Sequence, residues 1–338
     1  MNLVSKKHTN LFIELQDAIN ILYQSNDSEK LLDAYTAIIS FKYELPAFSD
    51  EYKDTIITDI NDISKTNTWQ ELTKLSNIKR IQSFENYRKI RPYLLNLLTE
   101  QKKIIKLLTP KFQMSNQNYQ SYLENDIYLL LQDYYLQNDF SSLEILNDCI
   151  QNECIFNTSL NNCVGKSVVS NALKNPYLGL KSTNNLDMML TIVHEVAHIK
   201  EFLQIKETES YKTLNDYIYQ RDYNEVTAKK AEFDFLTYLL EHGYCEADVK
   251  NMLVSKLLYS QSLINNISST ECECSTLLEL QQTLSKLRDY YGNTLVSFYE
   301  PDSSDIFIRC ELLDDIAHDE EKVVESVIPL KVISKVIK

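Results

Sequence analysis

Apolar side chains recur at intervals of three and four residues through most of the first 150 positions. This spacing gathers them on one face of an α-helix. The segments "LFIELQDAINILYQ" and "EKLLDAYTAIISFKYEL" show it, and it continues in residues 69–108 and in "YQSYLENDIYLLLQDYYLQNDF". Residues 1–150 are therefore expected to form a helical N-terminal region.

The pattern changes between Cys154 and Thr183. Helical spacing disappears there, and short β-prone pieces take its place: "CIFNTSL", "KSVVSNAL" and "PYLGLK". Gly165, Pro176 and Gly179, residues typical of turns, lie in the same stretch. The stretch predicts two or three short antiparallel strands. An exposed sheet edge can hold an extended peptide through main-chain hydrogen bonds, and "NPYLGLK" is the expected place for one.

Helical spacing resumes after these strands. One helix is expected over residues 186–203, with Asn184 or Asn185 as its N-cap. A second is expected over residues 223–242, ending at Gly243 because glycine favours the backbone conformation that closes a helix.

Composition supports a helical protein. The chain has only four glycines and six prolines in 338 residues, fewer than sheets and tight turns usually need. The expected fold class is mainly α: a multi-helical protein with a small antiparallel β-sheet that precedes the helix at 186–203. Residues 151–338 are expected to form a second region, either separate from residues 1–150 or continuous with them around a cleft.

Charge and cysteine content narrow the classes of partner. A net charge of −14 argues against a surface that binds nucleic acid, which is usually basic. The first residues, "MNLVSKKHTNLFIELQ", do not have the pattern of a signal peptide, and no apolar run is long enough to span a bilayer. Seven cysteines without framework spacing are typical of a reducing compartment. We expect a cytoplasmic protein without a nucleic-acid or membrane partner, of undetermined oligomeric state.

Two of the five histidines lie four residues apart in the stretch "LTIVHEVAHIKEF". On a helix, His194 and His198 share one face and can direct ring nitrogens at one point. Two imidazoles, a third protein ligand and an open position for water are typical of catalytic zinc. Glu195 then has the place of the general base, which is the physical reason for the H-E-x-x-H spacing.

The third ligand must come from another segment. Glu225 and Glu232 lie seven residues apart in "YNEVTAKKAEFDFLTYLLEHG", so both lie on one face of the expected helix. Either carboxylate can bind a metal, and the other can then hydrogen-bond to a ligand histidine. His242 is a weaker candidate, because a role at the end of the helix suffices to explain it.

The order of these motifs resembles the thimet oligopeptidase and oligoendopeptidase F family of zinc peptidases. The resemblance covers about residues 165–240, from "GKSVVSNALKNPYLGLK" through "HEVAH" to "NEVTAKKAEFDFLTYLL", with Ala197 where the family has glycine. It implies a zincin-like metallopeptidase fold with Glu225 as the third zinc ligand and Glu232 as its supporting carboxylate. It also implies peptide substrates.

The same family carries tyrosines late in the chain that stabilise the oxyanion of the transition state. The segment "LRDYYGNTLVSFYE" offers Tyr290, Tyr291 and Tyr299 for this role, and any of the three could fill it. A neutral hydroxyl is a suitable hydrogen-bond donor for a developing negative charge.

The function expected from these residues is that of an oligoendopeptidase: zinc-dependent hydrolysis of short, unstructured peptides. Two alternatives stay open. One is a carboxypeptidase-like zinc exopeptidase. The other is a non-catalytic helical protein that binds peptides or acts as a scaffold, with a structural zinc site. The carboxylate of Glu195 favours an enzyme, since a structural site has no need of a base.

Overall fold

The structure is a computed structural model that describes residues 3–4, 8–48, 51–76, 120–159, 165–207, 222–249 and 252. The chain divides into two compact units. Unit 1 comprises Met1–Lys79 and Ser121–Gln220, and unit 2 comprises Arg80–Gln120 and Arg221–Lys338. Unit 1 thus contains residues from both sides of the expected boundary at residue 150.

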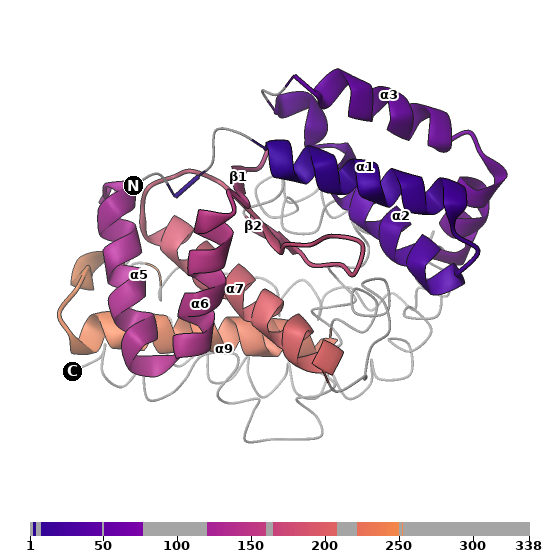
Figure 1. The fold of residues 1–338 in the computed structure, drawn as a ribbon. Coiled ribbons are helices and arrows are strands. Elements are labelled where there is room, and N and C mark those ends of the chain that lie inside the picture. Colours follow the sequence, from indigo (N-terminus) through magenta and orange to yellow (C-terminus); the bar gives the residue numbers. More distant parts are fainter. Residues whose placement is uncertain are drawn as a thin grey trace, which may run out of the picture. The chain divides into compact units, whose positions relative to one another are not determined.

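The described part is mainly helical with one small sheet, as the sequence predicts (Figure 1). The helices of unit 1 are α1 (Thr9–Gln24), α2 (Ser28–Lys42), the short 3-10 helix η1 (Leu45–Ala47), α3 (Lys53–Ile63), α5 (Glu124–Asn138), α6 (Phe140–Gln151) and α7 (Leu186–Glu207). Its strands are β1 (Ile155–Asn157), β2 (Gly165–Val168) and β3 (Tyr177–Leu180). The described helix of unit 2 is α9 (Asp222–Glu241).

The N-terminal helices follow their apolar spacing. Helix α1 buries the positions that the spacing selects: Leu11, Phe12, Leu15, Ala18, Ile19 and Leu22. Helix α2 begins at an N-cap, Asp27, whose carboxylate accepts hydrogen bonds from the backbone N–H of Glu29 at 3.0 Å and Lys30 at 3.4 Å. It ends at Lys42, before the apolar pattern does, and the chain continues into η1 with Pro46 near its start.

Of the two or three strands predicted, three are present, but their pairing is mixed and the prediction of an antiparallel sheet was wrong in part. The strand order is β1-β3-β2, with β1 parallel and β2 antiparallel to β3. The last strand in sequence inserts between the other two, which puts it alongside β1 in the same direction. "NPYLGLK" therefore contributes the central strand β3, whose two edges are already paired, and it cannot bind a peptide as expected.

The sheet lies between helices of unit 1. One face packs on α7, which contacts β2 and β3. On the opposite face, the ring of Phe41 from α2 lies 5.6 Å from that of Phe156 and 5.5 Å from that of Tyr177, measured between centroids. Figure 1 shows the strands between α2 and α7. Apolar side chains on both faces thus hold the short strands in place.

Helix α7 begins where the sequence predicts. The side-chain oxygen of Asn185 accepts hydrogen bonds from the N–H of Asp187 at 3.0 Å and of Met188 at 3.4 Å, so Asn185 is the N-cap. Lys200 joins α7 to α6 through the Asp139 carboxylate, with Nζ–O distances of 2.7 and 2.8 Å. No helix in the described ranges is both long enough and apolar enough to cross a membrane.

Helix α6 ends in a Schellman motif without glycine. The N–H of Cys154 donates to the carbonyl of Cys149 at 2.8 Å, and Glu153 between them has a φ of 57°. A side chain is strained in this left-handed conformation, whereas glycine is not. Glu153→Gly is therefore expected to raise the free energy of unfolding by up to about 1 kcal/mol.

The measurement is urea denaturation of the wild type and the variant. Glu144→Gly, in the exposed interior of the same helix, is the matched control and should lower the free energy of unfolding by about 1 kcal/mol. Equal destabilisation by both substitutions would contradict the assignment of the cap.

Candidate metal and catalytic site

The two histidines of α7 converge as their spacing predicts. The Nε2 atoms of His194 and His198 lie 3.0 Å apart, and the rings meet nearly at right angles, with an interplanar angle of 81°. Two nitrogen lone pairs facing each other at this distance repel, so a proton or a cation must lie between them. Nitrogens bound to one tetrahedral zinc ion lie about 3.3 Å apart. The pair therefore fits a metal with little adjustment.

Helix α7 holds this pair in a largely buried setting. His198 is 2% exposed and His194 is half-buried. The apolar positions of the helix that the sequence singles out are all buried: Met189, Ile192, Val193, Val196 and Ile199. Apolar packing thus holds the backbone of α7 that carries the two rings.

The Glu195 carboxylate is buried beside the strand β2. Its side chain is 5% exposed, and its Oε2 atom accepts no hydrogen bond from any residue that the structure describes. A buried carboxylate oxygen without a donor is unfavourable, and such groups are often found where a protein acts on a ligand or a proton. This is the environment expected of a base next to a metal.

Gly165 permits the close approach of β2 to Glu195. A Cβ atom at this position would clash with Cγ2 of Thr191 and would lie 3.2 Å from Oε1 of Glu195. The sequence marked Gly165 only as a turn residue, although a glycine inside a strand can also indicate a close backbone contact. The backbone of β2 thus forms one wall of the space around the carboxylate.

The candidate carboxylates of the third ligand lie in unit 2. Glu225 and Glu232 both fall in α9, seven residues apart and so on one helical face. Glu232 is buried, and the side chain of Glu225 lies outside what the structure describes. Among the described residues, no group of three His, Cys, Asp or Glu side chains forms a metal site. The ligand role of Glu225 and the supporting role of Glu232 stay predictions.

His242 lies at the C-terminal end of α9. Its Nδ1 is 2.9 Å from the carbonyl oxygen of Tyr238, and its ring stacks on that of Tyr244 at 6.2 Å between centroids. Gly243 follows with a φ of 69°, as predicted for the residue that ends the helix. These contacts agree with a role at the helix end. The candidate oxyanion residues Tyr290, Tyr291 and Tyr299 lie outside the described residues.

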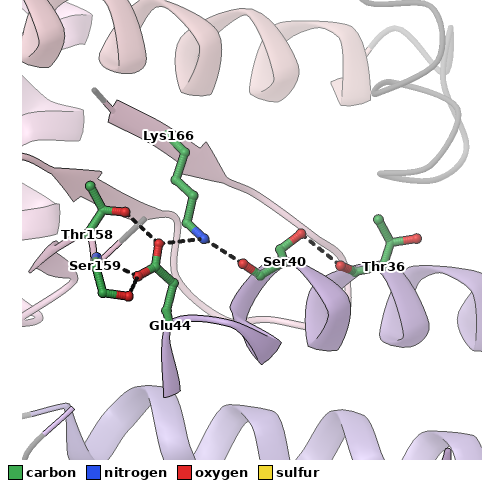
Figure 2. A network of polar contacts seen from close by, with 6 residues as sticks. All are labelled: Thr36, Ser40, Glu44, Thr158, Ser159 and Lys166. Atoms are coloured by element: carbon green, nitrogen blue, oxygen red, sulfur yellow. Dashed lines mark hydrogen bonds and ion pairs between the residues drawn. The ribbon is translucent and has the colours of Figure 1, made fainter. Parts of the chain in front are cut away.

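A buried ion pair on the other face of the sheet escaped the sequence analysis. Glu44, which is 0% exposed, accepts hydrogen bonds from the hydroxyl of Thr158 at 2.6 Å and from the N–H and hydroxyl of Ser159, both at 2.8 Å. Nζ of Lys166 lies 3.2 Å from the same carboxylate and donates to the carbonyl of Ser40 at 2.6 Å (Figure 2). The pair joins β2 to α2 and to the chain after β1.

This environment lowers the pKa of Glu44. Burial alone would raise it, but the Lys166 charge and the hydrogen bonds from Thr158 and Ser159 outweigh burial and hold the pKa below the ordinary value of 4.5. A carboxyl with a lowered pKa stabilises the fold above its unfolded-state pKa, and this contribution is lost as the pH falls through the folded-state pKa.

The free energy of unfolding should therefore decline as the pH is lowered below about 4.5, and Glu44→Gln should reduce that decline. Urea denaturation of both proteins at a series of pH values measures the difference. Asp139, whose pKa is lowered by hydrogen bonds from Lys200 and Ser142 despite burial, contributes equally to both proteins. Parallel curves for the wild type and the variant would show that Glu44 does not contribute.

Comparisons of this chain with protein-family models, with curated proteins and with solved structures give no match. The geometry of α7 and β2 and the spacing of the motifs are thus the features that bear on function.

Proposed function

We propose that this chain is a cytosolic zinc-dependent oligopeptidase that hydrolyses short, unstructured peptides. The observation that carries the proposal is the convergence of the His194 and His198 Nε2 atoms to 3.0 Å next to a buried Glu195 carboxylate. A pair of imidazoles aimed at one point suits a divalent cation. An adjacent carboxylate whose Oε2 accepts no hydrogen bond within the described ranges suits a base.

The donor set favours zinc. Imidazole nitrogens with one carboxylate are typical ligands of catalytic zinc, and Glu225 would complete the set with His194 and His198. Zinc bound there would acidify a water molecule and polarise the scissile carbonyl. Glu232, seven residues after Glu225, would orient a ligand through a hydrogen bond.

The protein's own groups carry the proton transfers. Glu195 takes a proton from the attacking water and delivers it to the nitrogen of the leaving amine. Its carboxylate is buried beside Gly165, next to the two histidines that would hold the metal. One of Tyr290, Tyr291 or Tyr299 donates a hydrogen bond to the oxyanion.

The peptide would bind along β2. Strand β2 pairs with β3 in the described sheet, and Gly165 brings the backbone of β2 to Glu195. A peptide bound in extended form along this strand would pass next to the base. Extended pairing requires a substrate without its own secondary structure, which is why short, unstructured peptides are the expected class.

The test is incubation of the purified, zinc-loaded protein with a mixed peptide library, with and without a chelator, followed by mass spectrometry of the products. We expect internal cleavage that the chelator abolishes and added zinc restores. Products trimmed only from the C-terminus would favour the carboxypeptidase-like alternative. Intact peptides in every arm, with zinc bound, would contradict the proposal and favour a structural zinc site.

A further inference from the structure

The strand β2 connects the proposed base to the buried ion pair. Successive side chains of a strand point to opposite faces. Gly165 faces α7, with its backbone against Thr191 and Glu195. The next residue, Lys166, points to the other face, and Figure 2 shows its side chain reaching toward α2 and Glu44. The backbone that borders Glu195 and the side chain that pairs with Glu44 thus belong to neighbouring residues of one strand.

Lys166 is held by three kinds of interaction. Its ammonium lies at the C-terminal end of α2, where the helix dipole favours a positive charge. It donates a hydrogen bond to the Ser40 carbonyl at 2.6 Å. It lies 3.2 Å from the Glu44 carboxylate. It also lies 5.5 Å and 5.6 Å from the ring centroids of Phe41 and Phe156. With its side chain 16% exposed, the ammonium is fixed in place.

The centre of the sheet leaves room for this side chain. Phe156, Gly179 and Lys166 pair across the three strands, so they lie on the same face. A Cβ atom on Gly179 would lie 2.7 Å from the Phe156 ring and 3.1 Å from Cγ of Lys166. The Phe156 ring and the stem of Lys166 thus share the space over Gly179. This packing directs the Lys166 side chain toward Glu44.

We infer that Lys166 is a positioning residue: it holds β2 against α7 so that the Gly165 backbone stays in contact with Glu195. This inference rests on the proposed function, in which Glu195 is the base. Gly165 has no side chain, so this contact depends on the position of the β2 backbone alone. Catalysis is sensitive to such shifts, since a displacement of about 1 Å can lower a rate by about 100-fold.

The test compares two matched double variants of the full chain. Glu44→Gln/Lys166→Met removes both charges of the buried pair, which avoids leaving either one buried alone. Asp17→Asn/Lys174→Met removes a second pair of unit 1, in which Nζ and the carboxylate oxygen lie 3.8 Å apart on the surface. Both variants and the wild type are measured for kcat and KM on a peptide cleaved in the library. Amide hydrogen exchange over residues 165–168 is measured in the same samples.

We expect kcat of Glu44→Gln/Lys166→Met to fall by roughly 10- to 100-fold, with faster exchange in β2 and with zinc still bound. The surface variant should match the wild type in every measurement. Unchanged kcat, a loss confined to KM, or unchanged exchange in β2 would each overturn the inference. If the wild type cleaves no peptide, the proposed function fails by itself. The exchange comparison then decides whether Lys166 holds β2, and unchanged exchange refutes it.

Discussion

Glu195→Gln is expected to lower kcat by roughly 100- to 10,000-fold while zinc stays bound. The amide has nearly the shape of the carboxylate but cannot accept a proton from the attacking water. Because Glu195 is buried and its Oε2 accepts no hydrogen bond from the described residues, the change removes no described contact of that atom. The measurements are steady-state kinetics and the metal content of the purified variant.

Glu144→Gln is the matched control for this prediction. Glu144 is exposed on α6, so its replacement should leave kcat and zinc content unchanged. Retention of wild-type kcat in Glu195→Gln would show that another group is the base. Loss of zinc together with activity would instead place Glu195 among the ligands.

Lys166→Met is expected to lower the free energy of unfolding by about 3 kcal/mol. The substitution keeps most of the apolar stem but leaves the Glu44 carboxylate, which is 0% exposed, without its cation. Because the hydrogen bonds from Thr158 and Ser159 to Glu44 persist, we expect a loss of stability at the lower end of the range for a broken buried ion pair. Urea denaturation at neutral pH measures it.

Lys174→Met provides the comparison for Lys166→Met. Lys174 pairs with Asp17 on the surface, where the two side chains are 74% and 54% exposed, so its loss should change the free energy of unfolding by less than about 1 kcal/mol. Adding Glu44→Gln to Lys166→Met should recover much of the lost stability, because no buried charge is then left unpaired. Equal effects of Lys166→Met and Lys174→Met would contradict this assignment.

Local patterns predicted most of the described elements. Helices α1, α2 and α7 follow apolar spacing, and α2 and α7 begin at capping residues. Both signals act within a few positions of the chain. The three strands were also predicted, but the order β1-β3-β2 was not. Strand order depends on which segments pair across turns and on what each face buries, and periodicity carries no information about that choice.

In the candidate site, too, local features could be predicted and contacts between distant segments could not. His194, Glu195 and His198 lie within one turn of a helix, so the spacing alone predicts that the two rings converge. The Glu44–Lys166 pair joins residues 122 positions apart in the sequence and appears only in the fold. The ligand role of Glu225 likewise depends on tertiary structure, since periodicity within α9 cannot say which helix face meets the histidines.

X-ray absorption spectroscopy of the zinc-loaded protein tests the metal site most directly. We predict one zinc per chain with two imidazole nitrogens at about 2.0–2.1 Å and an oxygen ligand at a similar distance. Glu225→Ala should remove the carboxylate contribution, and His198→Ala should abolish tight binding. A wild-type protein that binds no zinc, or whose zinc shows no imidazole ligands, would contradict the account. The 3.0 Å contact would then be a hydrogen bond between two histidines.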